Sequence, residues 1–499
     1  MPWARVLIII LCACSACYLV AYLALACIRM PYPYELEWME GGVLDGVGRV
    51  LSGKPLYVEP SLEFTPFGYS PLFFYVGAVI SKAFGSGFLP LRLVSFSASL
   101  GFLVVLLDFV RRDTGSLVAG IVAAGLFLAT YRIGGAWLDI ARVDSLFLFL
   151  LLMSISALRF RRSVGALALS GLLAFLSFMT KQAALPVLIA MTVYGLICLP
   201  RWRRIVFPAV VALLFLLSTL LLQERTGGWY WYYVFHLPNQ QIAPGAGTLS
   251  FWLHDMSRLS IALVVCLFSE LARPPAGRTT ASGCSLLFLV GMVGASWYSR
   301  LIPASYENVL LPAYAAISIS FGRGMAVLTP EALATASTMR AGHRHARVGV
   351  HEPFVLVLCA LQFLSLRYDP IAQLPTARDR RAGDALASMV RDQNGEVLLP
   401  SIGYLATRAG KRPSAHLLAL AAVLWSRDEG VKAALRDQIV RTLDGGNYRV
   451  LILDREPSGL EFDIRRRYTF RGNVFEEQDV FWPVTGLRTR PELIYELSE

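Results

Sequence analysis

The sequence predicts a polytopic α-helical membrane protein with a small α/β domain at its carboxyl end. Hydrophobic residues make up 56% of the 499 residues and charged residues only 16%, and the mean hydropathy is +0.55. Apolar runs recur up to about residue 367, and runs of this length indicate transmembrane helices. The composition excludes a soluble globular protein.

The first apolar run, Val6 to Ile28, is about 23 residues long, enough to cross a bilayer core of about 30 Å. The residues after Arg29 do not resemble a signal-peptide cleavage site, so we expect this helix to be retained. Applied along the chain, the same criterion predicts about eleven spans. They cover residues 6–28, 89–110, 115–135, 145–160, 164–181, 184–200, 206–222, 252–270, 283–298, 308–323 and 351–367.

The net charge of +11 is explained by where the basic residues lie. They occupy every second loop between the predicted helices, as the positive-inside rule expects of cytoplasmic loops. This pattern predicts a cytoplasmic N-terminus, an extracytoplasmic C-terminus and no nucleic-acid partner for a protein of the inner or plasma membrane. The clusters are Arg111-Arg112, Arg159 to Arg162, Arg201 to Arg204, Arg273 with Arg278, Arg323, and Arg340 to Arg347.

The first outer loop is predicted to be long, residues 29–88, and to contain an interfacial helix at Pro71–Phe84. This apolar segment is short, and a full span there would turn the loop of Arg111 and Arg112 outward. Most carboxylates of the membrane part then fall on the outer face, which the positive-inside rule does not require. The outer face is therefore the better candidate for the working face. These carboxylates are Glu35, Glu37, Glu40, Asp45, Glu59, Glu63, Asp139, Asp144, Glu224, Asp255 and Glu307.

The last part of the chain, residues 369–499, is predicted to be an extracytoplasmic domain that follows a membrane domain of residues 1–368. It is charged, and its helical and strand patterns alternate, which favours an α/β domain with parallel strands. It contains no GxGxxG or Walker-type loop, so a nucleotide site is not supported. The expected elements are helices at Ala377–Asp392 and Asp428–Leu443, and strands at Glu396–Pro400 and Tyr448–Asp454.

The first acidic cluster directly follows the first helix. Glu37 and Glu40 are three residues apart, so on one helical turn they share a face. A carboxylate at the membrane interface can act as a general base on a hydroxyl acceptor. Solvated loop carboxylates explain the spacing equally well, so the residues alone leave both interpretations open.

The second cluster places Asp139 and Asp144 at the top of two helices, with Arg142 between them. An ion network in which Arg142 neutralises one aspartate and a ligand site are equally compatible with this pattern. Lys181 ends an apolar helix with no acidic residue near in sequence. Such a cation suits a lipid-linked phosphate, although snorkelling to the interface also explains it. The aromatic run Gly228–Tyr233 is most simply an interfacial aromatic belt, although such rings also stack on sugars.

Several short segments resemble GT-C fold membrane glycosyltransferases, which include the protein O-mannosyltransferases and the aminoarabinose transferases. The similarity runs through about residues 1–320, and its segments keep the family's order and fall on one predicted side. The segments are Glu40-Gly41, Gly53-Lys54-Pro55-Leu56-Tyr57, Tyr69-Ser70-Pro71-Leu72, Arg142-Val143-Asp144-Ser145-Leu146, Phe178-Met179-Thr180-Lys181-Gln182 and Tyr306-Glu307-Asn308-Val309-Leu310-Leu311-Pro312.

The resemblance implies an inverting transfer of a sugar from a polyprenyl-phosphate donor to a glycan, lipid or protein acceptor. Glu40 matches the second acidic residue of the family's pair, but Met39 stands where the first is usual, so Glu37 is the alternative base. Asp144 supports the catalytic site, and Lys181 holds the donor phosphate. A divalent cation is used by some members and not by others. Further expected substrate-binding residues are Arg142, Asp139, Tyr57, Tyr69, Glu307 and Asn308.

Two other functions remain open from the sequence. A transporter would place ionisable residues near the bilayer midplane, often in repeated halves, whereas these carboxylates gather at one face and no internal repeat is visible. A non-catalytic protein of envelope assembly would use the C-terminal domain as its binding module. The sugar, the acceptor and the metal requirement have no linear signature in this sequence.

Overall fold

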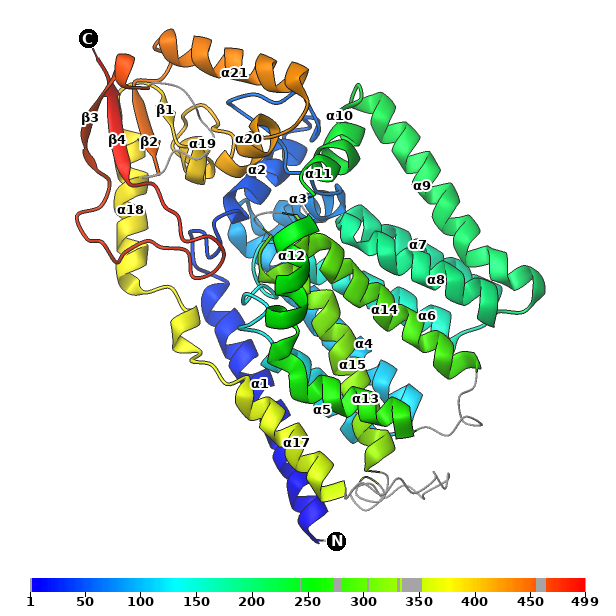
Figure 1. Ribbon diagram of the computed structural model, residues 1–499. Helices are drawn as coiled ribbons and strands as arrows, with labels where there is room; N and C mark the ends of the chain where they lie inside the picture. Colours follow the sequence, from blue (N-terminus) through cyan, green and yellow to red (C-terminus); the bar gives the residue numbers. More distant parts are fainter. Residues whose placement is uncertain are drawn as a thin grey trace.

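The computed structural model describes residues 2–242, 244–272, 280–302, 305–329, 333, 352–454 and 464–498. Helices side by side form the larger part of the molecule, and a small sheet with its own helices lies at one end of this bundle (Figure 1). The N-terminus lies at the far end of α1, away from the sheet. The basic segments at 273–278 and 340–347 lie outside the described residues.

Each of the eleven predicted apolar spans contains a helix in the structure. Five helices are long and apolar enough to cross a membrane by length and composition: 3–29, 88–114, 202–225, 247–271 and 307–328. The exact number of crossings stays a prediction, because several other helices are shorter. The bundle comprises α1 (Pro2–Arg29), α4 (Phe88–Thr114), α5 (Leu117–Ala129), α6 (Asp144–Phe160), α7 (Val164–Thr180), α8 (Leu185–Cys198), α9 (Val206–Arg225), α13 (Ser260–Ala272), α14 (Thr280–Arg300), α15 (Leu311–Leu328) and α17 (Glu352–Ser365).

Helix ends in the bundle follow from local chemistry. Ser116 caps α5 by accepting the backbone N–H of Ala119, and Ser163 caps α7 by accepting that of Ala166. Helix α7 ends because Lys181 is extended, with φ −152° and ψ 130°. Helices α6 and α7 pack together and are joined by a short loop. The start of α6 and the end of α7 therefore lie at the same end of the bundle.

The first outer loop contains two helices, α2 (Glu40–Leu51) and α3 (Leu72–Phe84), which pack against each other. Helix α3 also packs against α4 and α7. Short helical turns connect the later bundle helices. They are η1 (Gln182–Ala184), η2 (Arg201–Ile205), α10 (Trp229–Trp231), η3 (Tyr232–His236), α11 (Leu237–Gln240), α12 (Pro244–Ser250), η4 (Phe251–Asp255), η5 (Ser257–Leu259), η7 (Glu307–Leu310) and η8 (Ile371–Gln373).

The C-terminal part forms a four-stranded sheet in the order β1-β2-β4-β3. The pair β1 and β2 is parallel, as predicted, but β3 and β4 add an antiparallel hairpin that the sequence analysis did not predict. Four helices and two short turns accompany it. The elements are α18 (Ala377–Asp392), β1 (Val397–Leu398), η9 (Pro400–Ile402), α19 (Tyr404–Arg408), α20 (Leu417–Leu424), α21 (Glu429–Asp444), β2 (Val450–Leu453), η10 (Ile464–Arg466), β3 (Tyr468–Asn473) and β4 (Leu493–Leu497).

The C-terminal part shares a hydrophobic core with the first outer loop. Val43, Val47 and Phe74 of α2 and α3 belong to the same buried cluster as Leu420 and Val450. A separate buried cluster fills the helical bundle. The predicted boundary at residue 368 therefore separates sequence segments whose side chains pack together, and it stays a prediction as a domain boundary. The site described below lies where these two cores meet.

Candidate functional site

A buried ion pair joins the adjacent ends of α6 and α7. Lys181 Nζ lies 2.6 Å from Asp144 Oδ1, and Asn308 Nδ2 donates to the same oxygen at 3.1 Å. Asp144 is 1% exposed and Lys181 is 9% exposed. The structure thus brings together three of the predicted site residues, which come from three separate segments of the chain.

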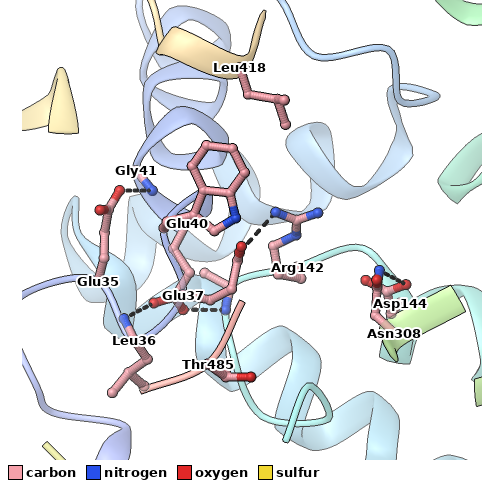
Figure 2. A network of polar contacts seen from close by, with 12 residues as sticks. Glu35, Leu36, Glu37, Glu40, Gly41, Arg142, Asp144, Asn308, Leu418 and Thr485 are labelled. Atoms are coloured by element: carbon pink, nitrogen blue, oxygen red, sulfur yellow. Dashed lines mark hydrogen bonds and ion pairs between the residues drawn. The ribbon is translucent and has the colours of Figure 1, made fainter. Parts of the chain in front are cut away.

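A second ion pair connects the predicted first outer loop, which contains Glu37, with the segment between α5 and α6, residues 130–143, which is called the second outer loop below. Arg142 Nη1 donates to Glu37 Oε2 at 2.9 Å, and Arg142 Nη2 donates to the hydroxyl of Tyr69 at 2.6 Å. Arg142 lies between Glu37 and the Asp144 cluster (Figure 2). The charge of Asp144 acts on both Arg142 and Glu37. Arg142 and Asp144 are two residues apart in the chain, so the two ion pairs are neighbours.

Glu40 has a different environment, with hydrogen bonds to both carboxylate oxygens. Arg92 donates to Oε1 at 3.0 Å through Nε and to Oε2 at 2.7 Å through Nη2. The backbone N–H of Ala141 donates to Oε1 and that of Leu36 to Oε2, each at 2.6 Å. Glu40 thus joins the two outer loops to α4, with no exposed surface.

Asp139 belongs to a third buried pair. Its carboxylate lies 3.3 Å from Arg29 Nε and accepts the hydroxyl of Tyr131 at 2.8 Å. Arg142 therefore hydrogen-bonds to neither aspartate. The alternative in which Arg142 pairs directly with Asp139 or Asp144 is therefore wrong. Its direct partner is Glu37, which comes from the first outer loop.

The remaining predicted site residues hold supporting or peripheral positions. Tyr57 is buried and donates its hydroxyl to the carbonyl of Tyr69 at 2.7 Å, so it positions Tyr69 rather than facing the ion pairs. Tyr57 also packs against Tyr230 and Tyr233, which are fully buried. The aromatic run is therefore not the simple interfacial belt that was predicted, since these two rings form part of the core. Glu307 begins η7 and is partly exposed.

The two glutamates of the first loop have opposite acidities. Burial raises the pKa of Glu37 to about 7, although the charge of Arg142 and the backbone N–H of Met39 oppose this rise. Burial also acts to raise the pKa of Glu40, but Arg92 and the two backbone N–H donors overcome it and lower that pKa. A carboxylate with a pKa near 7 can accept and release a proton at physiological pH. By this criterion Glu37 is the better-tuned general base.

Aromatic rings stand beside Glu37 and Arg142. Tyr306 lies edge-on to Trp38 and stacks with Trp137, at centroid distances of 6.3 Å in both cases. The guanidinium of Arg142 lies 5.5 Å from the ring of Trp137. His416 supports Trp38 from the C-terminal part, because its Nε2 lies 2.8 Å from the carbonyl of Trp38. His416 Nδ1 accepts a backbone N–H, so Nε2 is the donor, and burial lowers the pKa of His416 to about 4.

Five polar atoms of this site are buried without a hydrogen-bond partner among the described residues. They are Oε1 of Glu37, Nε of Arg142, Oδ2 of Asp144 and the indole Nε1 atoms of Trp38 and Trp137. Leaving a buried polar atom unpaired costs about 1–3 kcal/mol, and such a group in a native structure calls for an explanation. Both donors and acceptors are present, which suits a polar ligand.

No group of three or more His, Cys, Asp or Glu side chains suited to a metal ion occurs in the described part of the chain.

Several residues that organise the site are not among those predicted from the sequence. Arg92 lies inside an apolar span, and an isolated arginine there is a signal that could have been used. The sequence predicts Arg29 only as the end of the first helix, whereas its side chain pairs with Asp139. His416 and Thr485 come from the C-terminal part, and nothing in the linear sequence links them to the outer loops.

No protein-family model and no curated protein sequence matches the chain. Solved structures do match. ArnT from Cupriavidus metallidurans bound to undecaprenyl phosphate superposes with a TM-score of 0.60 at 12% identity, over 97% of each chain. The apo state of ArnT gives a TM-score of 0.58 over the same shares. AglB from Archaeoglobus fulgidus, in complex with an inhibitory peptide and a dolichol-phosphate, gives 0.52 at 12% identity, over 88% of this chain and 69% of AglB.

ArnT and AglB are both membrane glycosyltransferases of one fold class. The chain has the GT-C fold. The match to ArnT covers nearly all of both chains, so the C-terminal part is included in the likeness. The fold predicted from the sequence, an apolar helical bundle with a small C-terminal sheet, is therefore confirmed. At 12% identity the likeness concerns the GT-C fold alone, and the roles of individual residues rest on their own geometry.

Proposed function

We propose that the chain is a glycosyltransferase that moves a sugar from a polyprenyl-phosphate donor to a hydroxyl acceptor at the outer face of the membrane. The acceptor would be a cell-envelope glycan, lipid or protein. The observation that carries the proposal is the set of five buried polar atoms around Glu37, Arg142 and Asp144 that have no hydrogen-bond partner in the described part of the chain. Their position in a GT-C fold, one solved example of which holds undecaprenyl phosphate, supports a lipid-linked donor.

The donor phosphate would lie beside Lys181. The Nζ atom of Lys181 carries three N–H donors, and Asp144 accepts one of them. The remaining donors can bind phosphate oxygens, while Asp144, which also accepts a hydrogen bond from Asn308, holds the lysine in place. A fixed cation in a site shielded from water stabilises the charge that develops on a leaving phosphate. This arrangement supports the predicted role of Lys181.

Glu37 would act as the general base. Its Oε1 has no partner among the described residues, whereas its Oε2 is held by Arg142. In the proposed step, the proton of the acceptor hydroxyl passes to Glu37 as the acceptor oxygen forms a bond to the anomeric carbon. The bond between that carbon and the phosphate oxygen breaks, and its electron pair leaves with the polyprenyl phosphate. Attack opposite the leaving group inverts the anomeric centre.

Glu40 would have a positioning role in this mechanism. The resemblance ranked it first as the catalytic carboxylate, but Arg92 and two backbone N–H groups already bind both of its oxygens. A carboxylate bound in this way is a weak base, because each hydrogen bond stabilises its charged form. We therefore assign Glu37 as the general base. Glu40 instead holds the two outer loops together.

The experiment is a transfer assay with the full-length protein in liposomes. Polyprenyl-phosphate-linked sugars of several kinds are supplied with envelope extract as the acceptor source, and the release of polyprenyl phosphate is measured by mass spectrometry. The proposal predicts release that depends on both donor and acceptor, and its loss in Glu37→Gln. Exposed Glu59 provides a matched control, and Glu59→Gln should keep full activity. If Glu37→Gln and Asp144→Asn both release polyprenyl phosphate at the native rate, the site assignment is wrong.

A further inference from the structure

The connection between β3 and β4, residues 474–492, leaves the C-terminal sheet and reaches the candidate site. In Figure 1 this segment runs away from the sheet, past α18, toward the end of α1. Its ends are fixed within the C-terminal part. Glu492 N–H donates to the carbonyl of Leu453 at 2.8 Å, and the hydroxyl of Thr489 donates to Asp454. These bonds fix the connection to the C-terminal part, and its middle lies against the outer loops.

The middle of this connection pairs with the backbone beside Glu37. The carbonyl of Leu36 accepts the N–H of Val484 at 2.9 Å and the N–H of Thr485 at 3.1 Å. Glu37 and Thr485 form an isolated parallel β-bridge. Figure 2 shows Thr485 next to Leu36 and Glu37. These bonds restrict the backbone from which the Glu37 side chain projects.

The same segment also contacts the second outer loop. The hydroxyl of Thr485 donates to the carbonyl of Gly135, shortly before Trp137, whose ring lies beside Arg142. Thr485 therefore bonds to both loops that supply the Glu37–Arg142 pair. Thr485, a residue of the C-terminal part, thus helps to set the position of Glu37 relative to Arg142. Both of these residues come from the membrane part.

Gly486 lies directly against the Glu37 side chain. A Cβ atom at Gly486 would lie 2.9 Å from both Cγ and Oε1 of Glu37, and 2.9 Å from the Trp38 ring. These distances are shorter than real Cβ contacts, so a side chain there would displace Glu37 or Trp38. Gly486 also has a φ of +80°, a conformation that side-chain-bearing residues rarely adopt. The glycine allows the segment to approach Glu37 closely.

We propose that Val484–Gly486 forms one wall of the catalytic site and positions Glu37 opposite Arg142, so that the C-terminal domain is part of the catalytic machinery. The proposal rests on the function proposed above. It makes Thr485 and Gly486 positioning residues, since they act through Glu37. Transfer by a chain that lacks this wall would then fail at the chemical step rather than at donor binding.

The test compares Gly486→Ala with Gly410→Ala in the transfer assay. Gly410 also has a left-handed φ, +74°, and belongs to the C-terminal part, but a Cβ there meets nothing within 4 Å. In both variants an alanine must adopt a left-handed φ, which strains the backbone. Only in Gly486→Ala does the new Cβ atom also contact Glu37. We expect kcat to fall on the order of 10- to 100-fold in Gly486→Ala, with donor KM unchanged and a shifted midpoint of the pH–rate profile. Gly410→Ala should keep the native kcat and pH profile.

A second pair guards against a misfolded Gly486→Ala. Thr485→Val removes the hydroxyl that bonds to Gly135, and Thr469→Val removes a hydroxyl that hydrogen-bonds to Ser498 at 2.8 Å in the sheet, outside the connection between β3 and β4. We expect Thr485→Val alone to lower kcat, by about 3- to 10-fold for one lost hydrogen bond. Native kcat and pH profile in both Thr485→Val and a folded Gly486→Ala would overturn the proposal. If Glu37→Gln is inactive in the same assay, that result leaves the proposed function standing and removes only this inference.

Discussion

Glu37 and Arg142 form an asymmetric ion pair: Oε2 of Glu37 accepts a hydrogen bond of 2.9 Å from Arg142, while Oε1 has no partner among the described residues. The Glu40–Arg92 pair nearby differs, because both oxygens of Glu40 are bound. Burial of a fully bound pair fixes structure, whereas a buried carboxylate with one free oxygen can accept a proton.

The pH dependence of transfer should report Glu37. A general base must be deprotonated, and burial raises the pKa of Glu37 to about 7. We expect kcat/KM to rise with pH through a midpoint near 7, since this ratio reports groups of the free enzyme. The measurement is initial rate against pH at low donor concentration. A ratio that is constant from pH 5 to 9 would contradict the assignment, and it would fit Glu40, whose pKa is lowered.

Stability should also depend on the protonation of Glu37. Its pKa is higher in the folded protein than the ordinary glutamate value, so the folded state binds more protons between about pH 4.5 and pH 7. The free energy of unfolding should therefore fall as pH rises through this window. Thermal unfolding of the detergent-solubilised protein measures the effect, and Glu37→Gln should show a weaker fall. Identical pH dependence in the variant and the native protein would oppose this view.

The Glu40–Arg92 pair should matter for folding more than for chemistry. Arg92→Met leaves the buried charge of Glu40 without its cation, and breaking a buried pair in this way costs about 3–5 kcal/mol. We expect Arg92→Met and Glu40→Gln to lower the thermal midpoint strongly, and Glu37→Gln to lower it less. A Glu40→Gln protein with native stability and no transfer would instead restore Glu40 as the catalytic carboxylate.

Lys181 should determine the affinity for the lipid phosphate. Hydrogen bonds to charged groups contribute about 1.5–3 kcal/mol, which corresponds to a loss of about 10- to 150-fold in affinity for undecaprenyl phosphate in Lys181→Ala. Binding can be followed by titration of the protein in nanodiscs. Lys82 provides the control, because it is an exposed lysine of α3 outside the site. Equal affinity in Lys181→Ala, Lys82→Ala and the native protein would remove Lys181 from the phosphate site.

Local patterns in the sequence predicted the helices well. The helix expected at Ala377–Asp392 has these bounds in the structure, where Thr376 and Asp379 form a capping box. The hairpin of β3 and β4 was missed, because its strands lie partly exposed and lack a clear alternation of buried and exposed residues. Their pairing depends on contacts with β2 that a linear pattern does not encode.

The site was predicted only in part, because its partners are distant in the chain. Positive-inside topology placed Glu37, Arg142 and Asp144 on one face, but it could not pair Arg142 with Glu37 rather than with a neighbouring aspartate. The distinction between Glu37 and Glu40 also depends on Arg92, which lies on another helix. Which carboxylate is free to react is thus a property of the folded protein.

The most direct test of the central claim is a structure of this protein with bound undecaprenyl phosphate. We expect the phosphate to lie within hydrogen-bond distance of Lys181 Nζ and on the same side of Arg142 as Asp144. The anomeric position of a bound donor should then face Glu37 Oε1. A phosphate bound away from Lys181, with the Asp144–Lys181 and Glu37–Arg142 pairs unchanged, would contradict the account.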